Sequence, residues 1–252
     1  MYRYIAQFIL MLALGFSSTW VGLDSKNPKA IKPTVLGSNI QETYLSFEFA
    51  GYYAIDVETS NGIESIINLE GGSSILKSGT PDLDQFTSSI IIPDEGATSV
   101  EVISSSYHDF YNISVAPSKG NFSRLINPSD VPYEYGEAYE SDSFYPGILA
   151  ELRDPYILRD LRGQTVVVYP LQYNPQTETL RLYTQIELKV TTVGGQGANT
   201  LSRASSEQSI TKEFNSIYQN LFLNYDEDTR FEYIVDEGSM LVISYGDFMD
   251  EM

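Results

Sequence analysis

Short runs in which apolar and polar residues alternate recur along most of the chain, with turn residues between them. Tyr44–Phe49 alternates as a half-buried β-strand does. Tyr52–Val57 and Ile63–Leu69 read as neighbouring strands, because Ser60–Gly62 between them has the composition of a hairpin turn. Further strand-like runs occupy Phe86–Ile92, Val100–Ser104 and Thr165–Tyr169. Short strands at regular spacing predict an all-β fold, an antiparallel β-sandwich or a barrel.

One predicted strand is longer than the others. Leu180–Val190 alternates over most of its length but slips near Tyr183–Thr184, which predicts a β-bulge. The turn-forming segment Asn174–Thr179 leads into this strand. We therefore expect Val166–Pro170 and Leu180–Val190 to pair as a hairpin.

The C-terminal part of the chain has a different pattern. Phe214, Ile217, Tyr218 and Leu221 are spaced as one face of a short α-helix, which Ser209 or Thr211 would cap. Beyond it, Met240–Tyr245 is continuously apolar, as strands buried on both faces of a parallel α/β sheet are. The pattern thus predicts a β-sandwich with a short C-terminal helix, followed by the truncated first strand of an α/β domain.

The N-terminus has the features of an export signal. Arg3 precedes the apolar stretch Ile5–Phe16, and small residues follow it. The stretch is short for a membrane span, which needs about 20 apolar residues. We expect cleavage between Ser17 and Ser25, and an exported protein that is periplasmic or secreted.

Composition narrows the possible functions. The formal net charge of −19 argues against nucleic acid as a partner, because phosphates must be neutralised by Lys and Arg, and against an electrostatic grip on anionic membranes. The chain has no cysteine and a single histidine, His108, at the edge of a predicted strand. This excludes disulfides and a cysteine nucleophile, and no metal or cofactor motif is present. The sequence therefore predicts a protein that is not an enzyme.

A long loop between the predicted strands carries the candidate functional residues. Residues 116–147 contain four prolines, which restrict their own backbone and that of the residues before them. Two basic side chains, Lys119 and Arg124, lie in this loop of a very acidic protein. A basic residue on a stiffened loop is what the pocket of a trypsin-like peptidase binds. A purely solvated role for both residues is the alternative.

Several sequence blocks from Glu42 to Phe231 resemble the N-terminal prodomain of the gingipain-type cysteine peptidases. The blocks are Val100–Ser105, Ala116–Gly120, Asn127–Pro128, Pro132–Gly136, Phe144–Gly147, Asp154–Gln164, Pro170–Pro175 and Thr179–Thr184. In that family the prodomain is a folding assistant and a reversible inhibitor of the peptidase that follows it. The resemblance implies a cognate gingipain-like catalytic domain as the partner of this chain.

The resemblance also assigns roles to single residues. Arg124 matches the basic residue that enters the specificity pocket of the enzyme, and Lys119 is its competitor within the loop. Arg230 matches the residue after which the prodomain is removed, with Phe231 following the cut. The implied organisation is a signal peptide at 1–24, a flexible lead-in at 25–41, a β-sandwich prodomain at 42–193, a linker, helix and processing junction at 194–230, and the truncated start of a catalytic domain at 231–252.

A second reading remains open on the residues alone. The 19 tyrosines of the chain are also compatible with a secreted β-sandwich module that binds carbohydrate or protein. Aromatic residues in strands are more often core residues or cross-strand pairs than a ligand platform.

Overall fold

The computed structural model describes residues 18–23, 27–202 and 212–226. The apolar stretch of the expected export signal, the predicted cap residues Ser209 and Thr211, the junction at Arg230 and Phe231 and the predicted strand at 240–245 all lie outside these ranges.

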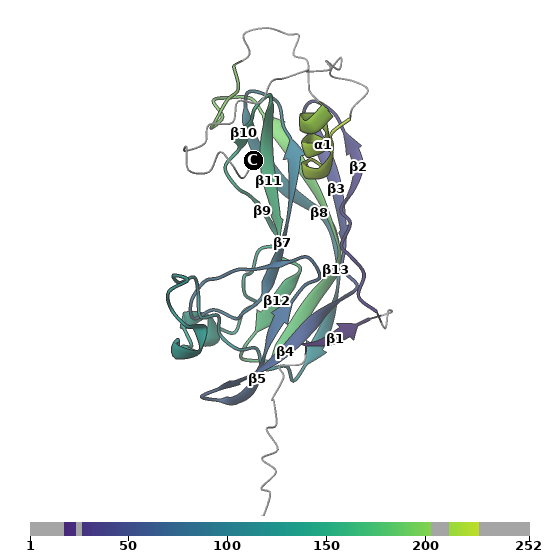
Figure 1. Cartoon of the computed structure of the whole chain (residues 1–252). Coiled ribbons are helices and arrows are strands. Elements are labelled where there is room, and N and C mark those ends of the chain that lie inside the picture. The colour runs from purple at the N-terminus through teal and green to yellow at the C-terminus, as the bar shows by residue number, and fades with distance from the viewer. Residues whose placement is uncertain (1–17, 24–26, 203–211, 227–252) are drawn as a thin grey trace, which may run out of the picture.

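Antiparallel β-structure dominates the described residues, as predicted, and forms three sheets (Figure 1). The first has the strand order β1-β4-β5 and consists of β1 (Ser18–Gly22), β4 (Gly51–Thr59) and β5 (Gly62–Asn68). The second has the order β10-β11-β7-β6, with β9 also paired to β11, and consists of β6 (Ser73–Ser74), β7 (Asp84–Ile91), β9 (Ala150–Leu152), β10 (Tyr156–Leu158) and β11 (Leu161–Val168). The third has the order β12-β13-β3-β2, with β8 also paired to β13, and consists of β2 (Thr34–Ser38), β3 (Glu42–Glu48), β8 (Ala97–Tyr111), β12 (Leu171–Asn174) and β13 (Thr179–Val193).

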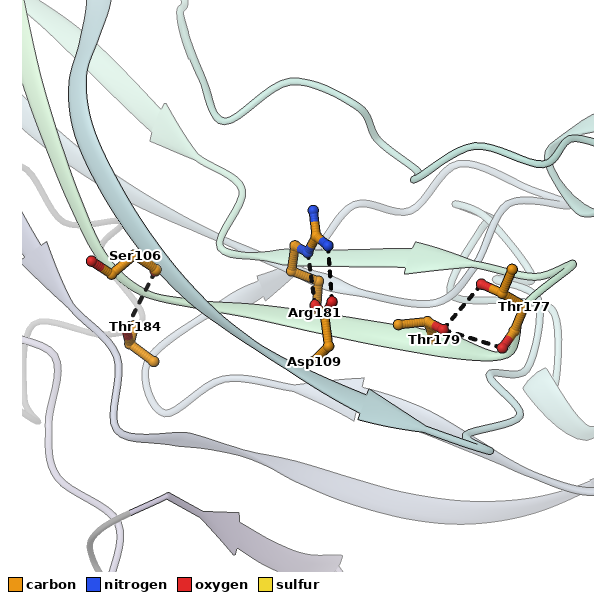
Figure 2. A network of polar contacts seen from close by, with 6 residues as sticks. All are labelled: Ser106, Asp109, Thr177, Thr179, Arg181 and Thr184. Atoms are coloured by element: carbon orange, nitrogen blue, oxygen red, sulfur yellow. Dashed lines mark hydrogen bonds and ion pairs between the residues drawn. The ribbon is translucent and has the colours of Figure 1, made fainter.

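The two 15-residue strands β8 and β13 run through both halves of the elongated molecule (Figure 1). Their pairing shifts register between Tyr183 and Gln185, which confirms the predicted bulge. Thr184 is the extra residue, and its hydroxyl donates to the main-chain oxygen of Ser106 at 3.3 Å. Figure 2 shows this contact beside the pairing of Arg181 on β13 with Asp109 on β8.

The predicted hairpin between Val166–Pro170 and Leu180–Val190 is wrong. β13 forms its hairpin with β12, where Leu171 lies opposite Leu182. β11 pairs instead with β7, β9 and β10 in the other sheet. The chain changes sheets between β11 and β12, so the apolar run that looked like one arm of the hairpin is followed by a second, shorter strand.

The main core gathers apolar side chains from all three sheets, including Tyr52 and Ile67 of the first. Its fully buried members include Leu45, Phe47, Ile90, Val166, Leu180 and Ile186. In β13 these residues alternate with more exposed ones, because successive side chains point to opposite faces of a sheet. In β11, by contrast, the consecutive residues Val166, Val167 and Val168 are all completely buried. The alternation read in the sequence therefore identified the inner face of β13, whereas β11 is buried on both faces.

The predicted helix is present as α1 (Lys212–Leu221), and its predicted inner face is confirmed for Phe214 and Tyr218 but not for Ile217 and Leu221. Tyr218 is completely buried and Phe222 nearly so, packed with Ile91 and Leu161. Ile217 and Leu221 are instead largely exposed. The side chains that fix the helix are thus spaced at i and i+4, with Phe222 lying just beyond the helix end. No helix in the described ranges is long and apolar enough to cross a membrane.

Several strands occupy segments for which the sequence predicted none, and two of them, β1 and β2, lie in the N-terminal part of the described chain. Ser18–Gly22, at the end of the expected signal peptide, forms β1 and pairs with Gly51–Ile55 of β4. Within the expected flexible lead-in at 25–41, β2 pairs with β3, so that part of the expectation is wrong. Edge strands such as these add main-chain hydrogen bonds to an existing sheet, and their own sequence pattern is weak.

Arg162 holds the glycine-rich segment after β13 against the sandwich. Its side chain is fully buried. The guanidinium donates to four main-chain oxygens, those of Pro93, Gly96, Ala198 and Asn199, at 2.6–3.1 Å. Burial in this carbonyl-lined site lowers the pKa of Arg162 from its usual value. The segment that reads as a free linker is therefore tied to the fold.

Candidate functional site

The loop at 116–147 begins on a buried, hydrogen-bonded base. Ala116, Pro117 and Ser118 are buried and run beside residues 79–82. The main-chain nitrogen of Ser118 donates to Thr80 at 2.7 Å, and that of Asp82 donates to Ala116 at 2.9 Å. These bonds fix where the loop leaves the sandwich.

Gly79 joins the two arms of the loop. Its nitrogen donates to the oxygen of Ser118 on the outgoing arm, and its oxygen accepts from the nitrogen of Gly136 on the returning arm, both at 2.9 Å. Gly120 has a φ of +78° and lies so close to Ser78 that a Cβ there would approach the Cβ of Ser78 to 2.9 Å. Glycine is required at this position by both the backbone conformation and the space.

Lys119 closes the loop above this base. Its ammonium donates to the main-chain oxygen of Pro128 at 2.9 Å and lies 4.2 Å from the centre of the Tyr133 ring. Both contacts are internal to the loop. The side chain of Lys119 is therefore committed to holding the loop closed.

The tip of the loop carries Arg124. The nitrogen of Ile126 donates to the oxygen of Ser123 at 2.9 Å, which makes Ser123–Ile126 a four-residue turn with Arg124 and Leu125 at its central positions. The side chain of Arg124 is exposed and has no hydrogen bond or ion pair to any of the described residues. The next segment is ordered by Asn127, whose side chain caps the 3-10 helix η1 (Pro128–Asp130) by accepting from Ser129.

Tyrosines tie the returning arm to the sandwich. Tyr135 donates to the carboxylate of Glu64 on β5, and Tyr139, in the 3-10 helix η2 (Glu137–Tyr139), donates to the oxygen of Val115 at 2.8 Å. The two rings contact edge to face at 4.9 Å between their centres. Burial, first of all, raises the pKa of each of these tyrosines, so both stay protonated donors at physiological pH.

The far end of the loop is fastened to β12 and β13. Tyr145 and Tyr173 exchange two main-chain hydrogen bonds of 2.8 and 2.9 Å. The Phe144 ring lies over Arg181, with 4.3 Å between the ring centre and the guanidinium carbon. Arg181 in turn makes two hydrogen bonds to Asp109, which lower the pKa of that carboxyl (Figure 2). The loop is thus braced at its base, its middle and its end, and the tip at 121–127 projects beyond these braces.

The returning arm of the loop is acidic. Glu134, Glu137, Glu140 and Asp142 line the returning arm of the loop, and each is at least partly exposed. Arg124 is therefore an exposed positive side chain in a loop whose returning arm is negatively charged. Because Lys119 is internally bonded, Arg124 is the basic residue of this loop that is available to a partner.

The other candidate residues fall in different places. Arg230 and Phe231 lie outside the described residues. His108 is exposed on β8 and contacts the Phe110 ring, and three of the tyrosines considered for a ligand platform, Tyr52, Tyr173 and Tyr218, are buried. No sequence signal pointed to the clasp made by Lys119 or to the turn at 123–126, since both depend on contacts that only the folded loop brings together.

Residues 24–231 of the chain match the model of the family Propeptide_C25. Among curated proteins, Gingipain R2 of Porphyromonas gingivalis W83 is 40% identical over 208 residues, which cover 82% of this chain and 27% of the relative. Lys-gingipain HG66 of the same species is 24% identical over 226 residues, which cover 84% of this chain and 13% of the relative. The chain thus spans about a third or less of the length of these relatives.

Two solved structures have the same fold. The complex of the RgpB pro- and mature domains of Porphyromonas gingivalis contains a chain that is 38% identical, with a TM-score of 0.70, over 77% of this chain and 98% of that one. A structure that addresses the zymogenic latency of gingipain K from the same species contains a chain that is 21% identical, with a TM-score of 0.60, over 71% of this chain and 100% of that one. The second likeness concerns the fold alone.

Proposed function

The chain belongs to the Propeptide_C25 family, the propeptides of the gingipain-type cysteine peptidases, and we propose that it is the folding assistant and reversible inhibitor of such a peptidase. A propeptide of this kind is not itself catalytic. The partner is a cognate gingipain-like catalytic domain, outside the cytoplasm. Inhibition works by insertion of Arg124 into the specificity pocket of that enzyme.

The observation that carries this proposal is the state of Arg124. Its guanidinium is exposed, is free of partners among the described residues and stands at the apex of a turn on a braced loop. Lys119, the other candidate, is held by Pro128 and Tyr133 within the loop. A planar guanidinium forms paired hydrogen bonds to a carboxylate, and such charge-assisted pairs are stronger than neutral ones. A pocket specific for arginine fits Arg124 better than one specific for lysine.

Removing the Arg124 side chain tests this function directly. The full chain should inhibit mature Gingipain R2, and Arg124→Ala should weaken the inhibition constant at least 30-fold. The reason is that truncating one member of a buried ion pair typically costs about 2–5 kcal/mol. The matched control is Arg153→Ala, which removes an arginine outside the loop and should leave inhibition unchanged. If Arg124→Ala inhibits as well as the wild type, the inhibitory contact is made by another residue. If the wild-type chain does not inhibit, the inhibitory function itself is refuted.

The processing step is the second part of the proposal. α1 and the segment after it lead the chain to Asp226, and Arg230 follows four positions later. We propose that the enzyme removes the propeptide by cutting between Arg230 and Phe231. The intact masses of the products formed in the same incubation report this cut, and a product that ends elsewhere would exclude it.

The turn at the tip also explains why the loop would inhibit without being consumed. Peptidases bind the residues around the scissile bond in an extended form, whereas the Arg124–Leu125 bond lies in the centre of a hydrogen-bonded turn. The surrounding braces oppose the extension of this turn. A synthetic peptide of residues 118–127 lacks the braces, so Gingipain R2 should cut it after Arg124 at a rate at least ten times that for the same bond in the folded chain. Mass spectrometry of both digests measures the two rates, and equal rates would contradict this explanation.

A further inference from the structure

The tip of the loop exposes an apolar side chain directly beside Arg124. Leu125 is 95% exposed, more than any other large apolar residue of the described chain, and Ile126 after it is 46% exposed. Isolated apolar residues on a surface are common and need no explanation. Here, however, the most exposed one occupies the turn position next to the residue proposed to bind the enzyme.

The turn fixes the position of Leu125 as firmly as that of Arg124. The nitrogen of Ile126 donates to the oxygen of Ser123, and the nitrogen of Leu125 lies 3.3 Å from the hydroxyl oxygen of Ser123, to which it donates. The two central residues of a β-turn are the ones its backbone bonds leave at the apex. Arg124 and Leu125 therefore stand side by side, one charged and one apolar.

The braces reduce the cost of using this pair in binding. Lys119 holds the oxygen of Pro128, and Asn127 caps the segment that follows the turn. A tip that is already ordered loses little conformational freedom when it docks. An exposed leucine on such a tip gains the free energy of leaving water without a large offsetting loss.

We propose that Leu125 is a second anchor of the inhibitory loop, which fills an apolar hollow of the peptidase next to the pocket that takes Arg124. This inference rests on the proposed inhibitory function and adds the chemistry of the partner surface. That surface combines a carboxylate-bearing pocket with an apolar depression on the side of the residue after the specificity residue. Leu125 is thereby a specificity-determining residue, because a cleft that is polar at this point would bind the loop less tightly.

The test compares variants of the full chain as inhibitors of mature Gingipain R2. Leu125→Ala should weaken the inhibition constant about 10–30-fold, since it removes most of the apolar surface that docking buries. Leu125→Asp should weaken it at least as much, because a carboxylate in an apolar hollow is left unpaired. The matched control is Ile40→Ala, which truncates a side chain that is 77% exposed away from the loop and should leave inhibition unchanged.

A loss of inhibition in these variants would not be caused by misfolding. Leu125 makes few contacts within the chain, so its variants should unfold at the same temperature as the wild type. If Leu125→Ala inhibits like the wild type while Arg124→Ala does not, the second anchor is refuted and the inhibitory function stands. If the wild type does not inhibit, the proposed function is refuted and the anchor with it.

Discussion

At the base of the loop, the side chain of Asp82 lies in surroundings that disfavour its negatively charged form. Burial, together with the neighbouring carboxylate of Asp84, raises its pKa from 3.8 to about 6. Its Oδ1 is buried without a hydrogen-bond partner among the described residues. Asp84, in contrast, accepts hydrogen bonds from Leu69, Asn68 and Ser74. The main-chain nitrogen of Asp82 donates one of the hydrogen bonds that fix the base of the loop. Ionisation of the Asp82 carboxyl therefore affects the stability of this part of the protein.

The substitution Asp82→Asn should stabilise the protein at pH 8 and leave it unchanged at pH 4. A carboxyl whose pKa is higher in the folded state binds its proton more tightly there, so the folded state loses stability as the pH rises from about 4 to about 6. The loss is complete above that range and is on the order of 1–3 kcal/mol. The tyrosines that face Asp82, Tyr133 and Tyr139, have raised pKa values and stay neutral in this window.

Urea denaturation of the wild type and the variant from pH 4 to pH 8 measures this effect. The wild type should be weakened relative to the variant as the pH rises from 4 to 6. The exposed Asp154→Asn provides the control for the loss of one negative charge. Parallel pH profiles for the wild type and Asp82→Asn would show that the carboxylate carries no such penalty.

At the scale of single elements, the first strand depends on a glycine opposite it. A Cβ at Gly51 would overlap the main-chain oxygen of Val21 and lie 2.7 Å from the Trp20 ring. Trp20 packs edge to face on Tyr53, with 5.0 Å between ring centres, and it is the single tryptophan of the sequence. Its fluorescence therefore reports whether β1 is docked.

We expect Gly51→Ala to displace β1 from β4 in the full chain. The tryptophan emission should shift to longer wavelength, because Trp20 moves into water, while the far-ultraviolet circular dichroism of the other strands changes little. Gly37→Ala is the matched control, since Gly37 also lies in a strand but a Cβ added there would meet no atom within 4 Å. An unshifted emission spectrum in Gly51→Ala would mean that β1 tolerates the added methyl group.

The sequence predicted elements well where packing follows from local alternation and poorly where partners are distant. The bulge at Tyr183–Thr184 was visible because the alternation of β13 slips there. The pairing of β11 was not, since its partner β7 lies far back in the chain. The predicted helical face was right for Phe214 and Tyr218 but wrong for Ile217 and Leu221, which are exposed. Phe222, just outside α1, joins the buried cluster with Ile91 instead.

The candidate site was predictable only in part. Arg124 followed from a family resemblance, and its exposure agrees with the role proposed for it. The loop composition did not distinguish Lys119 from Arg124, because the partners of Lys119 are the oxygen of Pro128 and the ring of Tyr133. Which of two nearby cations is bonded internally depends on the closed form of the loop, and the residue types alone do not encode it.

At the scale of the whole molecule, two continuous strands join the halves. β8 and β13 pair along their full lengths, and the Arg181–Asp109 pair links them close to the far end of the loop (Figure 2). The sheet that supports the far end of the loop is therefore the same sheet that contributes Leu180, Leu182 and Ile186 to the main core. A net charge of −19 gives the molecule as a whole an attraction to basic surfaces. In the inhibitory role proposed above, Arg124 is the local exception, a positive side chain for an acidic pocket.

The central position of β13 sets the order in which the protein is completed as it is made. β13 lies between β8 on one side and β3 and β12 on the other, yet among the described strands it comes last in the chain. The chain emerges from the ribosome or an export channel with its N-terminus first. The edges of β3 and β8 that pair with β13 therefore stay unpaired until residues 179–193 have emerged. Closure of a sheet by such distant pairing is slow and leaves unpaired edges exposed. The third sheet thus stays incomplete until just before α1 emerges, and the incompletely folded chain can still pass through a narrow channel.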